Sequence, residues 1–89
     1  MNIYIKVIYC QHFEIYTIDT NWSPSELYRN LRQSILNDFN ISNYELLDTI
    51  SYYNGKPEDK QKIESINYIS LNRLYGNEIK NLAIYIRPI

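Results

Sequence analysis

The stretch Met1-Asn2-Ile3-Tyr4-Ile5-Lys6-Val7 at the start of the chain and the stretch Leu82-Ala83-Ile84-Tyr85-Ile86-Arg87 at its end decide the fold. Apolar side chains recur at every second residue in both, which is the period of a half-buried strand. A second alternating run at residues 12–18 follows the first. The short gap at Cys10-Gln11 indicates a hairpin between these two runs, although it lacks the Asn-Gly or Asp-Gly pair of a primed turn.

The segment Ser23-Pro24-Ser25-Glu26 carries a helix-start signal. Ser23 can cap the helix, Pro24 fits the first helical position, and Glu26 can complete a capping box. An apolar stripe at helical spacing follows, and polar side chains occupy the opposite side. The stripe contains Leu27, Tyr28, Leu31, Ile35 and Phe39, and the polar side contains Arg29, Arg32, Gln33 and Asn37. We therefore expect a helix packed on the sheet, broken within residues 40–43.

The second half of the chain has weaker patterns. Residues 44–53 predict a third strand that ends at the turn Asn54-Gly55. The sequence after Pro57 predicts a short helix with Ile63 and Ile66 turned inward, and residues 67–71 predict a short strand. Gly76-Asn77 then turns the chain toward the final strand.

Composition limits the classes of protein to consider. With 89 residues the chain forms one domain, 1–89, with a single core. The formal charge of −1 lacks the basic excess of nucleic-acid-binding proteins, so we expect no nucleic acid partner. No apolar run reaches the ~20 residues that cross a bilayer, and the amino terminus lacks a secretory signal. These observations predict a soluble, cytoplasmic protein without a membrane partner.

The residues offer little for catalysis or metal binding. Cys10 and His12 are the only cysteine and histidine, so the sequence predicts no disulfide, no zinc site and no cofactor. Cys10 and His12 could share a face of the hairpin as a thiolate pair, but no third group orients them. Glu45 with Asp48, and the neighbours at positions 58 and 59, are interpreted as solvated surface carboxylates. We therefore predict that the protein is not an enzyme.

The order hairpin, helix, strand, irregular crossing and closing strand predicts an α+β fold, with a mixed sheet and one main helix on one face. With that order, the chain resembles the ubiquitin-like (β-grasp) family, whose last strand pairs parallel beside the first. Residues 1–7 are similar to the opening MQIFVKT of ubiquitin, and Asn54-Gly55-Lys56 is similar to the family's Ala-Gly-Lys. Residues 82–87 resemble its closing strand, whereas residues 56–81 are longer than the family's segment and match it poorly.

The resemblance implies a function that depends on the tail. Conjugated members and sulfur carriers of the family end in a flexible Gly-Gly, whereas this sequence ends in Arg87-Pro88-Ile89. The implied function is that of a non-conjugated module that binds a protein partner through one face of its sheet. Matching positions place Tyr4, Lys6, Tyr52, Ala83 and Tyr85 on that face. Tyrosine suits such surfaces because it combines apolar area with a polar tip, although the same tyrosines could be ordinary strand formers.

Two further interpretations stay open. The alternation of Leu46, Ile50 and Tyr52 leaves apolar surface, which favours a structural or assembly subunit that forms a homo-oligomer, such as a virion component. The chain is also rich in Ile, Asn and Tyr and poor in Gly, which is typical of an A/T-rich genome such as that of a large DNA virus, a protozoan or a low-GC bacterium. A viral or parasite mimic of ubiquitin is therefore an extension of the binding-module interpretation.

Overall fold

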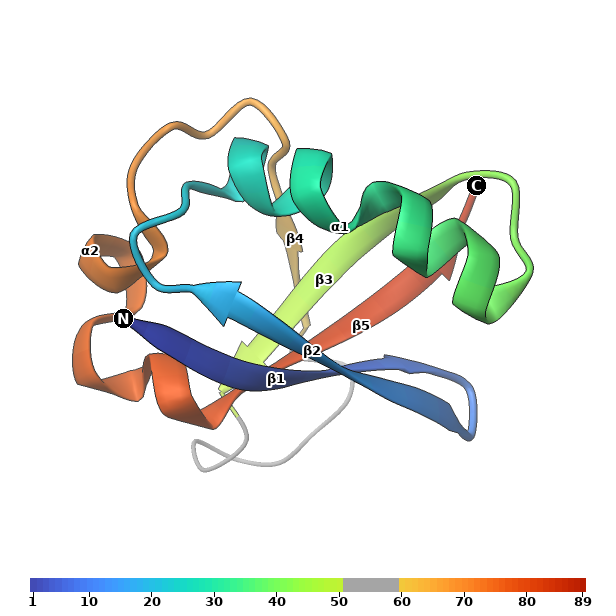
Figure 1. The fold of residues 1–89 in the computed structure, drawn as a ribbon, viewed down its shortest axis with the longest axis horizontal. Coiled ribbons are helices and arrows are strands. Elements are labelled where there is room, and N and C mark those ends of the chain that lie inside the picture. Colours follow the sequence, from blue (N-terminus) through green and yellow to red (C-terminus); the bar gives the residue numbers. More distant parts are fainter. Residues whose placement is uncertain (51–59) are drawn as a thin grey trace.

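The computed structural model describes residues 1–50 and 60–89. Within these residues the protein is a small α+β domain in which a five-stranded mixed sheet packs against one long helix, α1, and a short helix, α2, lies near one end of the sheet (Figure 1). In chain order the elements are β1 (Asn2–Tyr9), β2 (His12–Asp19), α1 (Pro24–Phe39), β3 (Tyr44–Ile50), β4 (Gln61–Ile63), α2 (Leu71–Tyr75), the 3₁₀ helix η2 (Gly76–Asn81) and β5 (Leu82–Pro88).

The strands are arranged in the order β2-β1-β5-β3-β4. β1 and β2 form an antiparallel hairpin, β5 runs parallel to β1, and β3 is antiparallel to both β5 and β4. The predicted parallel pairing of the first and last strands is thus confirmed, with Val7 opposite Ile84. The two stretches that decide the fold lie side by side in the middle of the sheet.

The hairpin turn explains how β1 and β2 join without an Asn-Gly pair. Tyr9 pairs with His12, so Cys10 and Gln11 are the two central residues of the turn. Cys10 has a φ of 55°, whereas Gln11 does not have a positive φ. A positive φ at the first central position alone is the pattern of a type II′ turn, whose twist suits a hairpin. The predicted hairpin is therefore correct.

Helix α1 forms as the sequence predicts. The Ser23 side chain accepts a hydrogen bond from the Glu26 backbone N–H, and the Glu26 carboxylate accepts one from the Ser23 backbone N–H, which completes the capping box. The helix ends at Asn40, whose φ of 54° is a left-handed C-cap conformation. The predicted apolar stripe is buried apart from the half-buried Tyr28, with Leu27 and Ile35 fully covered.

The crossing between β3 and β5 differs from the prediction. Residues 61–63 form strand β4 instead of helix, because Ile63 pairs with Leu46 of β3 and is buried there. Ile66 was expected to turn inward but is 73% exposed. The strand predicted at residues 67–71 is also wrong, because the Ser70 side chain caps the Arg73 N–H and starts α2. The predicted end of the third strand at residues 51–53 and the Asn54-Gly55 turn lie outside the described residues.

The core lies between α1 and the sheet. Its fully buried members include Val7 of β1, Leu46 of β3 and Ile84 of β5. The position of Leu46 corrects the expectation that this residue leaves apolar surface exposed. Leu46 lies opposite Ile86 of β5, and the residues of this row face the helix.

Candidate protein-binding surface

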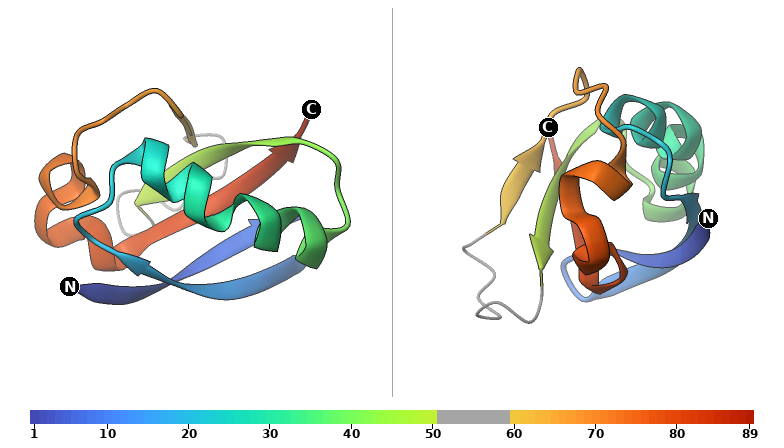
Figure 2. Two further views of the ribbon diagram at one scale, coloured as in Figure 1. Left: turned by 45° about the horizontal axis from the view of Figure 1, so that its top comes forward. Right: turned by 90° about the vertical axis from the view of Figure 1, so that its left-hand side faces the viewer.

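The face of the sheet opposite α1 carries four of the five predicted binding residues. Lys6 and Ala83 are paired across the parallel β1–β5 ladder, and Tyr85 lies two pairs further along, opposite Ile8. Tyr4 precedes Lys6 by two residues, so its side chain is on the same face. α1 lies on the other face of the sheet (Figure 2). Tyr52, the fifth predicted residue, lies outside the described residues.

We call this surface the outer face. By strand register and ring contacts its described members are Tyr4, Lys6, Ile8, Phe13, Ile15, Thr17, Glu45, Leu47, Lys60, Lys62, Ala83, Tyr85 and Arg87. Tyr4 is 78% exposed, and Phe13 and Ile15 are each about half exposed. The outer face therefore presents several large apolar side chains to solvent along the hairpin.

Phe13 and Ile15 are the residues of this surface that the sequence analysis missed. They lie directly opposite Ile8 and Lys6 in the antiparallel hairpin, so they share the face of those residues. The signal was present in the alternation of residues 12–18. Combined with a two-residue turn at Cys10-Gln11, that alternation fixes which side chains of β2 accompany those of β1.

Two lysines of the outer face lie over aromatic rings. The Lys6 ammonium is 4.5 Å from the centre of the Phe13 ring, and the Lys60 ammonium is 3.8 Å from the centre of the Tyr85 ring. Both distances are within the range of a cation–π attraction, which holds the charge above the apolar surface. Neither lysine forms an ion pair with a carboxylate among the residues that the structure describes.

The one acidic group among the named members of the outer face is Glu45. Its carboxylate accepts a hydrogen bond from Arg87 and lies 3.5 Å from the Lys62 ammonium. The hydrogen bond from Arg87, followed by the positive charges of Arg87 and Lys62, lowers the pKa of Glu45. The outer face thus combines four cationic side chains with a single carboxylate, although the whole chain has one more acidic than basic residue. Its charge is therefore opposite in sign to that of the chain.

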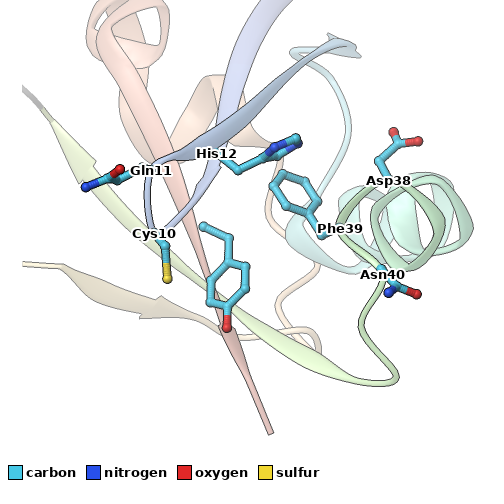
Figure 3. A pocket seen from close by; sticks show the side chains of 7 residues that line it. Cys10, Gln11, His12, Asp38, Phe39 and Asn40 are labelled. Atoms are coloured by element: carbon cyan, nitrogen blue, oxygen red, sulfur yellow. The ribbon is translucent and has the colours of Figure 1, made fainter.

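The thiolate pair that was considered and set aside for Cys10 and His12 is not formed. His12 Nε2 lies 3.1 Å from Glu14 Oε1, and the imidazole packs edge-on against the Phe39 ring at 5.0 Å between centres. Cys10, His12 and Phe39 line a hollow of about 570 Å³ between the hairpin and the end of α1. Figure 3 shows the Cys10 sulfur directed away from the His12 imidazole. Cys10 is an exposed free thiol. The two side chains have no contact that would activate a nucleophile.

The carboxylates considered as pairs are also separated. Glu45 is on the outer face, whereas Asp48 lies opposite the buried Ile84 and accepts a hydrogen bond from the Tyr75 hydroxyl. Burial, followed by this hydrogen bond to Asp48, raises the pKa of Tyr75. The acidic residues at positions 58 and 59 lie outside the described residues. Glu45 and Asp48 therefore have separate structural partners and do not act together.

Within residues 1–50 and 60–89, no three histidine, cysteine or acidic side chains gather as a metal site. The helices of this part of the chain are too short or too polar to span a bilayer. Comparison of the chain with protein-family models, curated proteins and solved structures finds no significant match. The outer face is therefore assessed on its own geometry and chemistry.

Proposed function

We propose that this protein is a non-catalytic interaction module with a ubiquitin-like β-grasp fold, which binds a protein partner through its outer face. The observation that carries the proposal is the composition of that face. Tyr4, Phe13 and Ile15 expose apolar area on the hairpin. Lys6 lies over the Phe13 ring of the hairpin, and Lys60 lies over the Tyr85 ring of β5. Aromatic anchors with a polar rim are the usual composition of protein interfaces.

The element order supports the fold assignment in this proposal. A hairpin, a capped helix, a third strand and a closing strand parallel to the first follow one another in the chain. These are the features on which the resemblance to the β-grasp was based.

Physical reasoning favours binding over simple surface coverage. When a partner covers an exposed tyrosine such as Tyr4, its apolar area is buried and its hydroxyl forms a hydrogen bond, at a low cost in side-chain entropy. Lys6 and Lys60 are charged groups already held in place by rings, so less conformational freedom is lost when a partner approaches. A sheet that only needed a solvated outer surface would carry more polar side chains at positions 4, 13 and 15.

The test is a matched pair of substitutions. Tyr4→Glu places a charge on the outer face, and Tyr68→Glu makes the same change at an equally exposed tyrosine in the loop before α2. Immobilised wild type and both variants are used to capture proteins from lysate of the native cell, and each captured protein is then purified and titrated by calorimetry. We expect Tyr4→Glu to weaken binding by at least tenfold and Tyr68→Glu to leave it unchanged.

Two outcomes would contradict binding through the outer face. Equal loss of binding in both variants, or no loss in either, would exclude the outer face as the binding site, provided that circular dichroism shows both variants to be folded.

Competition with excess free ubiquitin tests the mimicry extension separately. Displacement of the partner by ubiquitin supports mimicry, and its absence leaves a module with its own partner.

A second candidate function, assembly as a homo-oligomer, is favoured by the position of β2. This eight-residue strand is at the edge of the described sheet, contains no proline, and exposes Phe13 and Ile15. An unpaired edge of this kind is a template for strand pairing with a second copy. Sedimentation equilibrium discriminates the two functions, because assembly gives a mass that rises with protein concentration and a transient module remains monomeric.

A further inference from the structure

The ladder between β1 and β5 stops before either strand ends. Pairing covers Lys6–Ile8 with Ala83–Tyr85, whereas β1 continues to Tyr9 and β5 to Pro88. The hairpin and the end of β5 then diverge, as Figure 1 shows at the side of the molecule that carries the carboxyl terminus. A groove of about 550 Å³ opens at this divergence. We call it the fork groove.

The fork groove combines apolar and cationic groups. Leu47 and Tyr85 contribute apolar surface, and Lys60, Lys62 and Arg87 contribute three positive charges. None of its described lining residues is acidic. The groove therefore has a charge that attracts anions and a surface that accepts an apolar side chain.

The three cations are held in position by groups next to the groove. Lys60 lies over the Tyr85 ring, and Lys62 and Arg87 converge on the largely buried carboxylate of Glu45. The side chains of Lys62 and Arg87 remain 51% and 63% exposed, so their charges are accessible from solvent. Glu45 thus positions two cations without covering them.

The backbone of β5 adds a further feature. Ile86 and Arg87 pair with Leu46 and Glu45 of β3 on one side. The opposite edge of β5 is not paired with β1 beyond Tyr85 in the described sheet. An open strand edge beside a groove suits a ligand in an extended conformation.

We propose that the fork groove binds an extended acidic peptide segment of the partner protein, with its carboxylates at Lys60, Lys62 and Arg87 and an apolar side chain against Leu47 and Tyr85. This inference rests on the proposed function, because it assigns the chemistry of the partner at one end of the outer face. A nucleic acid fits less well, since polyanion binding requires many phosphate contacts and the chain as a whole carries a charge of −1.

The first test uses defined peptides and the complete ¹⁵N-labelled protein. The acidic probe is acetyl-Glu-Glu-Leu-Tyr-Glu-Glu-amide, with one control in which lysine replaces glutamate and one in which serine replaces leucine and tyrosine. We expect the acidic probe to shift the amide resonances of Leu47, Lys62 and Arg87, the serine control to bind more weakly, and the lysine control to have no effect. No shift at these amides, equal shifts with the lysine control, or equal shifts with inorganic phosphate alone would overturn the proposal.

The second test uses a charge reversal with a matched control. Lys60→Glu changes a residue that has no ion pair among the described residues, and Lys80→Glu makes the same change on η2. We expect Lys60→Glu to weaken binding of the acidic probe by about tenfold, Lys60→Gln by less, and Lys80→Glu not to change it. Equal binding by wild type and Lys60→Glu would overturn the proposal.

These results separate the two proposals. If Tyr4→Glu abolishes partner binding while Lys60→Glu does not affect it, the outer face binds the partner and the fork-groove assignment is wrong. If Lys60→Glu weakens binding of the acidic probe while Tyr4→Glu leaves partner binding unchanged, the fork groove is a peptide site and the proposed role of the exposed hairpin residues of the outer face in partner binding is wrong.

Discussion

Two stacked tyrosines, one from α1 and one from β3, provide a sharp test of the packing. Tyr28 and Tyr44 lie nearly parallel, with ring centres 6.0 Å apart. The hydroxyl of Tyr28 accepts a hydrogen bond from the Leu46 N–H at 2.9 Å and donates one to the Ile63 carbonyl at 3.4 Å. The hydroxyl of Tyr44 is buried and has no hydrogen-bond partner among the described residues. Removal of each hydroxyl should therefore have opposite effects.

The magnitudes follow from these contacts. A buried hydroxyl without a partner costs about 1–3 kcal/mol, so Tyr44→Phe should raise the free energy of unfolding by about 1 kcal/mol after allowance for the lost packing volume. Tyr28→Phe removes the hydroxyl that accepts a hydrogen bond from the N–H of the fully buried Leu46. We expect this variant to lower the free energy of unfolding by roughly 1–3 kcal/mol.

Urea denaturation and thermal melts followed by circular dichroism measure both changes. In a domain of this size, 1 kcal/mol corresponds to a shift in Tm of about 4–8 °C. Tyr44→Phe is expected to melt higher than the wild type and Tyr28→Phe lower. A destabilised Tyr44→Phe variant, or changes of the same sign in both variants, would refute the reasoning, because the buried hydroxyl of Tyr44 would then have a favourable partner.

The dependence of the free energy of unfolding on alkaline pH is an independent test of the burial of the Tyr44 hydroxyl. Burial raises the pKa of Tyr44 to about 12, above the ordinary value of 10.0. Because the folded protein holds this proton more tightly than the unfolded chain, the associated stability is complete below pH 10.0 and is lost as the pH rises toward about 12. Tyr44→Phe should therefore lose stability less steeply than the wild type above pH 10.0 and show the same pH dependence below it.

Three further predictions concern the helix and the outer face. Leu31→Ala removes a buried side chain of α1 and should cost about 2–5 kcal/mol in urea denaturation, and a change below about 0.5 kcal/mol would contradict helix-on-sheet packing. Ser23→Ala removes the helix cap and should cost about 0.5–2 kcal/mol, whereas Ser23→Asp should retain most of that stability in the same assay. Glu45 has a lowered pKa, so its stabilising contribution is present above the ordinary value of 4.5 and is lost as the pH falls through the lower folded value. Glu45→Gln should consequently show a flatter loss of stability in acid than the wild type, and identical acid titrations of stability would argue against the contact with Arg87.

The elements predicted correctly from sequence are those with strong local signals. Residues 3–9 and 12–18 alternate at a period of two, and Ser23 to Glu26 form a capping box, so each signal is contained in a few neighbouring residues. β4 has only three residues and depends on pairing with β3, which residues 61–63 do not encode locally. Residues 67–71 were wrongly predicted as a strand because Ser70, whose side chain caps the Arg73 N–H, was not recognised as the start of a helix.

The candidate site was predicted in part for the same reason. Tyr4, Lys6, Ala83 and Tyr85 were predicted from the positions that match the ubiquitin-like family, and they lie on two strands with a strong local alternation. The grouping of Lys60, Lys62 and Arg87 in the fork groove was not predicted. Glu45 and Arg87 meet only through the register of β3 with β5, across 42 positions of sequence. The placement of Lys60 over Tyr85 likewise depends on tertiary packing.

The central position of β5 has a consequence for synthesis of the protein. β5 joins the β1–β2 hairpin to β3 and β4, and of the described strands it leaves the ribosome last. Until residues 82–88 emerge, the two halves of the sheet each have an open edge, and contacts across so long a sequence separation form slowly. The nascent chain is therefore vulnerable to aggregation and proteolysis until these residues have emerged. A premature stop codon before Leu82 would yield two unconnected strand pairs instead of a shorter domain.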